Sequence, residues 1–311
     1  MKNALRTISD RPLSKLIFGA MQFGGNADLP TSQRLFSAAH AAGVNHFDTA
    51  HGYTEGASEI ILGDLVRQER DEFFVATKVG YIGGTGRDAI LSQFETSRLR
   101  LNLDVVDLLY MHRFDTETTL EETFDTLAEL QSRGSIRFIG VSNYAAWQVM
   151  KAQSVAASLG TRIDVVQPMY SLVKRQAEVE LLPMCQDQGI LPATYSPLGG
   201  GLLTGKYSSG GTGRLTEDSR YAARYRPDWM HTAATELANI ARDMGVEAST
   251  LAVAWAAKSP FGVHPIISAR NVEQLIPSLA AIELDLNDSL YDQLTALTPT
   301  PAPATDRLEE A

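Results

Sequence analysis

Eight short segments rich in β-branched and aromatic residues recur along the chain, and stretches with helical periodicity separate them. These segments are residues 16–23, 44–50, 73–79, 105–112, 136–143, 164–170, 190–197 and 264–270. Strands that alternate with helices predict a parallel sheet, because a helix is the usual connection between two parallel strands. The pattern therefore predicts an α/β protein.

The strands are expected to close into a barrel. Several of them are apolar almost throughout, as a parallel strand covered on both faces requires. The main alternative is a doubly wound open sheet, which holds a dinucleotide with the motif Gly-x-Gly-x-x-Gly between a strand and a helix. No segment here is followed by that motif. We therefore expect a single-domain (β/α)8 TIM barrel over residues 1–299.

Three local patterns add detail to this barrel. A helix is expected over residues 120–130, opened by a capping box of Thr119 and Glu122. Residues 4–13 are expected to form a small hairpin that closes the bottom of the barrel. The Pro-rich tail, residues 300–311, is expected to be disordered.

The interval between the last two strands is far longer than the others. It begins with a Gly-rich stretch, residues 196–213, and continues with two helical patterns around Thr235 and Leu251. We expect the Gly-rich stretch to form a flexible loop over the barrel mouth that closes over a cofactor, because Lys206 and many backbone amides there suit a phosphate. The alternative is a solvated surface loop.

Composition narrows the classes of function. The chain has 27 basic and 37 acidic residues, a net charge of -10, which argues against a surface that coats nucleic acid. Its one cysteine, Cys185, allows neither an internal disulfide nor a cysteine metal cluster. Because no secretory pattern and no membrane-length apolar run is evident, we expect a cytoplasmic protein without a membrane partner.

Four polar residues follow neighbouring strands. Asp48 ends the second strand, Tyr53 lies five residues later, Lys78 ends the third strand and His112 ends the fourth. Each alone has an ordinary explanation, respectively a helix cap, a packed loop aromatic, a solvated strand end and a core histidine. Because the carboxyl ends of barrel strands meet at one mouth, their arrival together favours an active site.

The chemistry of the four residues is consistent. A phenol with its usual pKa of about 10 is a poor acid–base catalyst at neutral pH unless its anion is stabilised. We expect the Lys78 ammonium to lower the pKa of Tyr53, and Asp48 to keep that ammonium in place and charged. A ring N–H of His112 would then polarise a carbonyl oxygen.

The motifs that carry these residues resemble those of the aldo-keto reductase superfamily over nearly the whole chain. They are GVNHFDTAHGY followed by SEIILG, VATKVG, DLLYMHRFD, IGVSNY, VVQPMYSLVKR and YSPLGGGLLTGKY. An arginine directly after the histidine, here Arg113 after His112, resembles the longer-loop branch of this superfamily. That branch includes sugar- and pyridoxal-type reductases and potassium-channel β subunits. The resemblance implies that Asp48, Tyr53, Lys78 and His112 form a catalytic tetrad that reduces an aldehyde or ketone, with Tyr53 as proton donor and NADPH as coenzyme.

The resemblance also implies where the coenzyme lies. Ser142, Asn143 and Gln167 match positions that bind the nicotinamide carboxamide, and Tyr195 matches the residue that stacks on its ring. Ala20, Met21 and Asp48 are further coenzyme positions. The resemblance also implies Ser196, Pro197, Leu198 and Lys206 at the pyrophosphate, and Arg270 and Gln274 at the adenosine end.

Arg270 favours NADPH over NADH, since a guanidinium binds the oxygens of a 2′-phosphate well. The alternative for Arg270 is a solvated charge at a strand end. The chain departs from many relatives at Pro277 and Ser278, where they carry Glu and Asn that contact adenosine.

Five residues in the mouth loops are candidates for the substrate pocket, and loop packing is the alternative for each. They are Met21, His51, Tyr81, Phe114 and Tyr144. No metal is expected, the partner is a small carbonyl substrate, and the oligomeric state stays open. Two other functions are also open: a nucleotide-sensing regulatory subunit, and a Schiff-base aldolase that uses Lys78 as its nucleophile.

Overall fold

A computed structural model describes residues 5–307 and 309 of the chain. Eight parallel strands pair in chain order and close into one barrel, so the predicted fold is confirmed. They are β1 (Ile17–Gly19), β2 (His46–Asp48), β3 (Phe74–Val79), β4 (Val106–Met111), β5 (Ile136–Ser142), β6 (Val165–Gln167), β7 (Leu191–Tyr195) and β8 (His264–Ile267). Each lies within the segment expected from the sequence.

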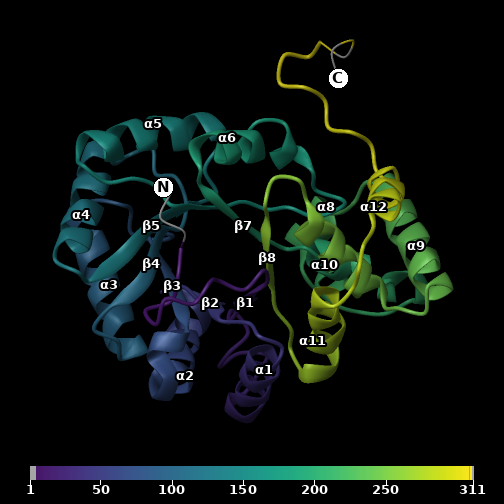
Figure 1. Cartoon of the computed structure of the whole chain (residues 1–311), viewed down its shortest axis with the longest axis horizontal. Helices are drawn as coiled ribbons and strands as arrows, with labels where there is room; N and C mark the ends of the chain where they lie inside the picture. Colours follow the sequence, from purple (N-terminus) through teal and green to yellow (C-terminus); the bar gives the residue numbers. More distant parts are fainter. Residues whose placement is uncertain (1–4, 308, 310–311) are drawn as a thin grey trace.

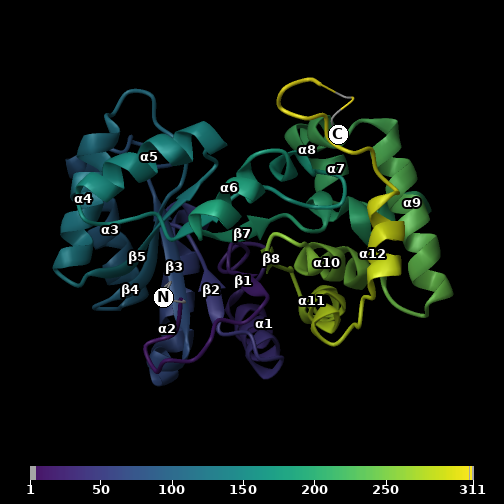
Figure 2. The same cartoon turned by 45° about the horizontal axis from the view of Figure 1, so that its top comes forward.

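Helices surround the barrel (Figure 1). They are α1 (Leu29–Ala41), α2 (Ala57–Val66), α3 (Arg87–Leu101), α4 (Leu120–Ser132), α5 (Ala146–Ser158), α6 (Leu181–Gln188), α7 (Arg214–Glu217), α8 (Ser219–Arg224), α9 (Asp228–Asp243), α10 (Ala248–Lys258), α11 (Val272–Leu279) and α12 (Asp288–Thr295). Helices α9, α10 and α12 gather on the side of the barrel away from α3 and α4 (Figure 2). Among the described residues, no helix is both long and apolar enough to cross a membrane.

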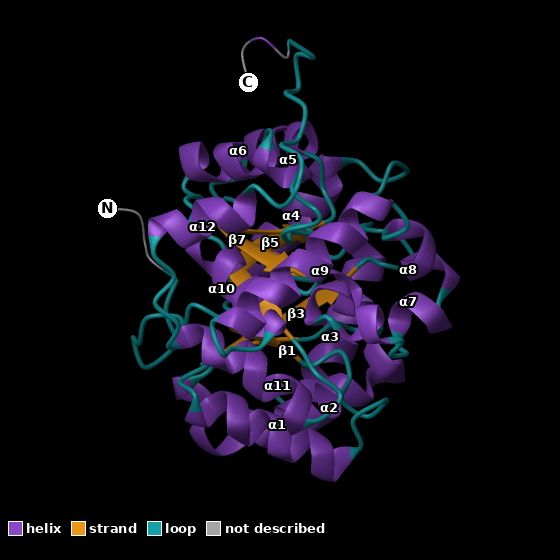
Figure 3. Ribbon diagram, turned by 90° about the vertical axis from the view of Figure 1, so that its right-hand side faces the viewer, coloured by secondary structure: helices purple, strands orange, loops and turns teal. Residues whose placement is uncertain are grey.

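The strands lie at the centre of the molecule with helices around them (Figure 3), and the barrel encloses its own small core. Because side chains alternate along a strand, every second residue points inward and the others pack beneath the helices. The inward apolar cluster includes Phe74, Leu108, Val165 and Ile266. Further along the strands the inward side chains become polar, and this is where the site begins.

The amino-terminal hairpin is confirmed in its described part by an antiparallel bridge between Arg6 and Pro12. Residue 4 lies outside the described residues. The hairpin is held to the start of β2, because the Asn45 side chain donates to Pro12 O at 2.8 Å and accepts from Ser14 N at 2.7 Å. It therefore sits at the end of the barrel opposite Asp48.

The expected capping box of α4 forms only in part. Thr119 Oγ1 accepts from Glu122 N at 3.3 Å, as predicted. The Glu122 carboxylate instead accepts from Arg87 N at 2.9 Å, at the first turn of α3. Glu122 thus joins two neighbouring helices. The other half of the capping box, a bond from the Thr119 N–H to the Glu122 side chain, was a wrong prediction.

The segment after β7 is more regular than the flexible loop that we expected. It forms two 3-10 turns, Gly199–Thr204 and Lys206–Ser209, and α7 and α8 follow. Gly199, Gly200 and Gly201 all have positive φ, which side-chain-bearing residues rarely adopt. The two helices expected around Thr235 and Leu251 are confirmed as α9 and α10.

The expected disorder of the tail stays a prediction. Residues 300–307 contain no helix or strand, and residues 308, 310 and 311 lie outside the described residues.

Candidate active site

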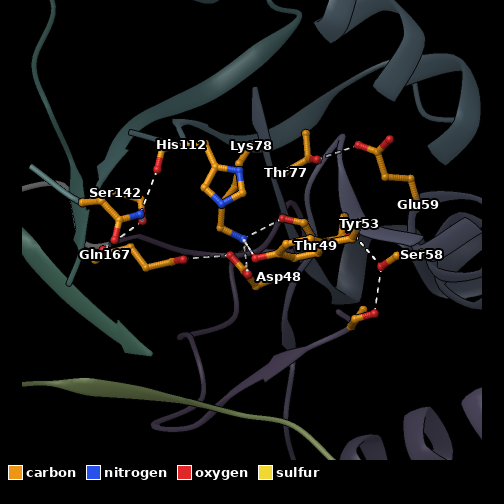
Figure 4. A network of polar contacts seen from close by, with 12 residues as sticks. Asp48, Thr49, Tyr53, Ser58, Glu59, Thr77, Lys78, His112, Ser142 and Gln167 are labelled. Carbon is orange, nitrogen blue, oxygen red and sulfur yellow. Dashed lines mark hydrogen bonds and ion pairs between the residues drawn. The ribbon is translucent and has the colours of Figure 1, made fainter. Parts of the chain in front are cut away.

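The carboxyl ends of β2, β3 and β4 bring together the four residues that the sequence singled out (Figure 4). Asp48 and Lys78 are strand residues, and His112 directly follows β4. Tyr53 opens the 3-10 turn Tyr53–Gly56 between β2 and α2. The predicted convergence of these side chains is what the structure shows.

Lys78 lies at the centre of the cluster, with its side chain fully buried. Its ammonium donates to the Asp48 carboxylate, to Thr49 O at 2.7 Å and towards the Tyr53 hydroxyl at 3.5 Å. Burial alone disfavours the charged form, but the charge of Asp48 and the hydrogen bonds to Asp48 and Tyr53 leave the pKa of Lys78 raised. The ammonium therefore keeps its charge, as expected.

Asp48 has a second partner across the barrel. Gln167 Nε2, at the end of β6, donates to Asp48 Oδ2 at 3.0 Å. Both carboxylate oxygens are therefore occupied, one by Lys78 and one by Gln167. The sequence suggested Gln167 only as a ligand of the coenzyme, and its contact with Asp48 was not foreseen.

The pKa of Tyr53 differs from our expectation. Burial raises it and is the largest effect, while the charge of Lys78 lowers it and that of Asp48 raises it again. Lys78 lowers the pKa as expected, but burial outweighs it, and the net result is a pKa above the usual value for tyrosine. Lys78 offsets part of the desolvation without reversing it.

His112 is held uncharged. Burial lowers its pKa to about 3, and the charges of Lys78 and Arg113 act in the same direction. Its ring meets that of Tyr53 edge to face, with centroids 5.8 Å apart. A neutral imidazole has one ring N–H to donate, which is the form that the expected polarising role requires.

The residues expected around a nicotinamide lie together at the ends of β5, β6 and β7. Asn143 Nδ2 donates to His112 O at 2.9 Å, and its Oδ1 accepts from the Tyr195 hydroxyl at 2.8 Å. Ser142 Oγ donates to Gln167 O at 3.0 Å. The half-buried Tyr195 ring is thus fixed beside His112 by a single asparagine.

The residues expected at the coenzyme phosphates lie on the segment after β7 and on the loop after β8. Arg270 Nη2 is 3.6 Å from Glu217 Oε2 of α7, so the two segments meet. Gln274 Oε1 accepts from Arg270 N at 3.2 Å. Lys206 Nζ lies 4.9 Å from the centroid of the Tyr207 ring.

Ala20, Met21, Ser196, Pro197 and Leu198 complete the coenzyme candidates. Ala20 is buried, and its N–H donates to Asp48 O at 2.8 Å. Met21 is half-buried beside it, and Ser196 has a φ of 63° at the turn that leaves β7. Pro197 is buried and Leu198 half-buried in the same turn. Their coenzyme contacts stay predictions.

The substrate-pocket candidates divide into three groups. Tyr81 is half exposed and its ring lies 4.9 Å from that of His112. Phe114 and Tyr144 pack against each other at 5.1 Å, and Tyr144 is buried. His51 is turned towards α3, where Nδ1 is 3.3 Å from Ser97 Oγ. Tyr81 therefore has the most direct access to the site.

One residue near the site was missed by the sequence analysis. Tyr221 of α8 lies against Gly200, where a Cβ would be 2.9 Å from its ring, and Tyr221 acts to raise the pKa of both Tyr53 and Tyr195. Arg214 and Arg224 lie over its ring at 5.4 and 5.2 Å. Tyr221 lies in a connecting segment rather than at a strand end, so its sequence position gave no signal.

Known proteins resemble this chain in sequence. A profile of the Aldo/keto reductase family matches residues 15–299. A probable voltage-gated potassium channel subunit beta of Oryza sativa subsp. japonica is 32% identical over 92% of this chain and 93% of its own length. The uncharacterized oxidoreductase YrpG of Bacillus subtilis (strain 168) is 31% identical over 93% of both chains. Aflatoxin B1 aldehyde reductase member 4 of Homo sapiens is 41% identical over 61% of this chain and 60% of its own.

These similarities define the class of the protein. The chain belongs to the aldo/keto reductase family. It is accordingly an NAD(P)H-dependent oxidoreductase that acts on carbonyl groups.

Proposed function

We propose that the protein reduces an aldehyde or ketone to an alcohol with NADPH, and that Tyr53 gives the proton to the carbonyl oxygen. The observation that carries this proposal is the Tyr53 hydroxyl, which lies 3.5 Å from the buried Lys78 ammonium and beside the neutral ring of His112. Three groups thus lie together. Tyr53 can donate the proton, Lys78 can stabilise the phenolate, and His112 can donate a second hydrogen bond to the substrate oxygen.

The raised pKa of Tyr53 keeps the phenol protonated, as a donor must be, but it also makes the phenol a weaker acid, which the charge of Lys78 offsets only in part. At neutral pH the phenol keeps its proton until the substrate oxygen gains negative charge. The proton then moves from the phenol to that oxygen, and Lys78 stabilises the phenolate left behind. A His112 ring N–H would hydrogen-bond to the same oxygen and orient it.

The residues at the barrel mouth fit a nicotinamide coenzyme, which when bound supplies the hydride. The half-buried Tyr195 ring offers a stacking surface, and its hydroxyl is fixed by Asn143. Arg270 keeps about 39% of its side chain exposed and contacts only one acid, at 3.6 Å, among the ion pairs of the described residues. A guanidinium so placed favours the 2′-phosphate of NADPH.

The direct test is a panel of aliphatic and aromatic aldehydes and ketones, with loss of NADPH absorbance as the signal. We expect turnover with several aldehydes, and less with NADH than with NADPH at equal concentrations. A protein that binds NADPH tightly but consumes no carbonyl in the panel contradicts the proposed activity.

Coenzyme selection has its own prediction. Arg270→Ala should weaken NADPH binding by about 10- to 100-fold, the worth of a charged hydrogen bond, and change NADH binding little. Arg242→Ala, at an exposed arginine of α9, is the matched control. Titration of each coenzyme measures both affinities, and equal weakening of NADPH and NADH would rule out the 2′-phosphate role.

A regulatory subunit is the second candidate, because a relative at 32% identity is named a probable potassium channel subunit beta. Under that alternative the chain would bind NADPH and act through a partner with little turnover of its own. The carbonyl panel separates the two functions.

A Schiff-base aldolase is less well supported. Its nucleophile must be an uncharged amine, whereas the surroundings of Lys78 raise its pKa and keep the ammonium. Borohydride trapping of a substrate on Lys78 would support the aldolase instead. A cytoplasmic location remains a prediction from the sequence.

A further inference from the structure

The backbone directly after Tyr53 is strained. Thr54 and Glu55 have φ values of 46° and 56°, and Gly56 has 97°, so three consecutive residues are left-handed. For residues with a side chain this conformation costs about 1–2 kcal/mol each. Such strain persists only where the surroundings impose it, and it is often found at functional sites.

Two hydrogen bonds hold one side of this turn. Thr54 Oγ1 donates to Phe23 O at 2.8 Å, in the loop after β1, and accepts from Ser58 N at 3.0 Å. They attach the turn to α2 and to the loop after β1. Neither reaches the strand that carries Lys78.

Arg100, near the end of α3, holds the other side. Its Nη1 donates to His51 O at 3.0 Å, and His51 N in turn donates to Lys78 O at 3.0 Å. The guanidinium also lies flat on Gly56, where a Cβ would be only 2.4 Å from Arg100 Cζ. A side chain at position 56 would therefore displace the arginine.

Glu59 on α2 fixes the guanidinium from behind. Its carboxylate is fully buried, with Oε2 3.3 Å from Arg100 Nη1. Its Oε1 accepts from Thr77 Oγ1 at 2.7 Å, and Thr77 immediately precedes Lys78 in β3 (Figure 4). A buried carboxylate requires a counterion, so Arg100 cannot swing away without leaving Glu59 unpaired.

We propose that Arg100 is a positioning residue for the reduction. It joins the peptide of His51, the backbone of Gly56 and the carboxylate of Glu59, and so holds the Tyr53 hydroxyl within reach of Lys78 from behind the site. This inference rests on the proposed role of Tyr53. It assigns a function to a helix residue whose contacts are with His51, Gly56 and Glu59.

The test compares Arg100→Ala with Arg98→Ala. Arg98 lies on the same helix and forms its ion pairs with Glu95 and Asp104. We expect Arg100→Ala to lower kcat at least about tenfold while NADPH affinity stays within about twofold, and Arg98→Ala to leave both unchanged. Arg100→Lys, which keeps a charge beside Glu59 but loses the planar fork, should fall between them.

A double-mutant cycle separates positioning from general loosening of the structure. If Arg100 acts through Tyr53, Arg100→Ala should cost little further kcat once Tyr53 is already Phe. Multiplied losses in the double variant would overturn the inference, as would an Arg100→Ala protein with the kcat of Arg98→Ala. Should Arg100→Ala not fold, wild-type kcat in folded Arg100→Lys would overturn it, and a lower kcat with unchanged NADPH affinity would support it.

The proposed function can fail separately. If Tyr53→Phe keeps wild-type turnover, the proton-donor role is wrong and the positioning role falls with it. If Tyr53→Phe loses turnover but Arg100→Ala does not, only the inference about Arg100 is wrong.

Discussion

The groups around the Tyr53 hydroxyl are held in different charge states by their surroundings. Lys78 stays charged because Asp48 pairs with it, and His112 stays neutral because burial lowers its pKa to about 3. Tyr53 stays protonated because burial raises its pKa. These separate states let a donor and a stabilising charge operate together near neutral pH.

Lys78 and Asp48 should depend on each other for stability. Lys78→Met should lower the free energy of unfolding by about 3–5 kcal/mol, because it leaves the Asp48 carboxylate buried without its counterion. Adding Asp48→Asn should restore part of that loss. Urea unfolding of the three variants measures this, and a double variant less stable than Lys78→Met would contradict the account.

The sequence predicts the chemically active side chains better than their supports. Asp48 and Lys78 lie at the carboxyl ends of their strands and His112 directly follows β4, so barrel geometry alone brings them together. Glu59 and Arg100 lie 41 positions apart on two helices, and only helix packing makes them meet. The direction of the Tyr53 pKa also needs the structure, because it depends on how much burial outweighs Lys78.

At the scale of the elements, α2 and α3 approach unusually closely. A Cβ on Gly63 of α2 would lie only 2.1 Å from Leu101 O at the end of α3. This contact brings Arg100 against the turn that carries Tyr53. A glycine in the interior of α2 is thus required by packing, although it disfavours the helix itself.

Gly63→Ala should therefore destabilise the protein. In an open helix this change adds about 1 kcal/mol of stability, but here it forces the helices apart and should cost roughly 1–3 kcal/mol. Gly52→Ala is the control, since nothing lies within 4 Å of its Cβ position and its φ is -88°. A thermal melt in which Gly63→Ala is as stable as wild type would refute this packing argument.

The strands were predictable because their apolar runs are distinct, whereas the segment after β7 was not. Its glycines suggest a flexible loop, yet they supply the left-handed residues of compact 3-10 turns that lead into α7 and α8. Gly200 shows why, because a Cβ there would lie 2.9 Å from the Tyr221 ring. Composition alone does not distinguish glycine that loosens a chain from glycine that permits close packing.

At the scale of the whole molecule, one buried and two half-buried histidines should make the fold sensitive to acid. Burial lowers the pKa of His46 and His112 to about 3 and that of His264 to about 4. Below about pH 6.5 the unfolded chain takes up protons that these residues refuse when folded. Their contribution to stability is therefore complete above that pH and decreases as the pH falls towards 3–4.

His46 offers the cleanest test because it lies inside the barrel, away from Tyr53. Between pH 7 and pH 4 the free energy of unfolding should fall less in His46→Gln than in wild type. The difference between the two falls should be at most about 3 kcal/mol. His231→Gln, at an exposed position on α9, is the control. Unfolding curves at both pH values measure the change. If the free energy of unfolding falls equally in His46→Gln and wild type, His46 is not a source of the acid sensitivity.

The most direct measurement of the central claim is a single turnover of Tyr53→Phe with bound NADPH and saturating aldehyde, followed at the coenzyme absorbance. Phe keeps the ring beside His112 but removes the only proton that Tyr53 can give. The account predicts NADPH affinity within about twofold of wild type and a rate lower by at least about 100-fold, the usual worth of a general acid. A Tyr53→Phe protein that reduces the aldehyde at the wild-type rate would contradict it.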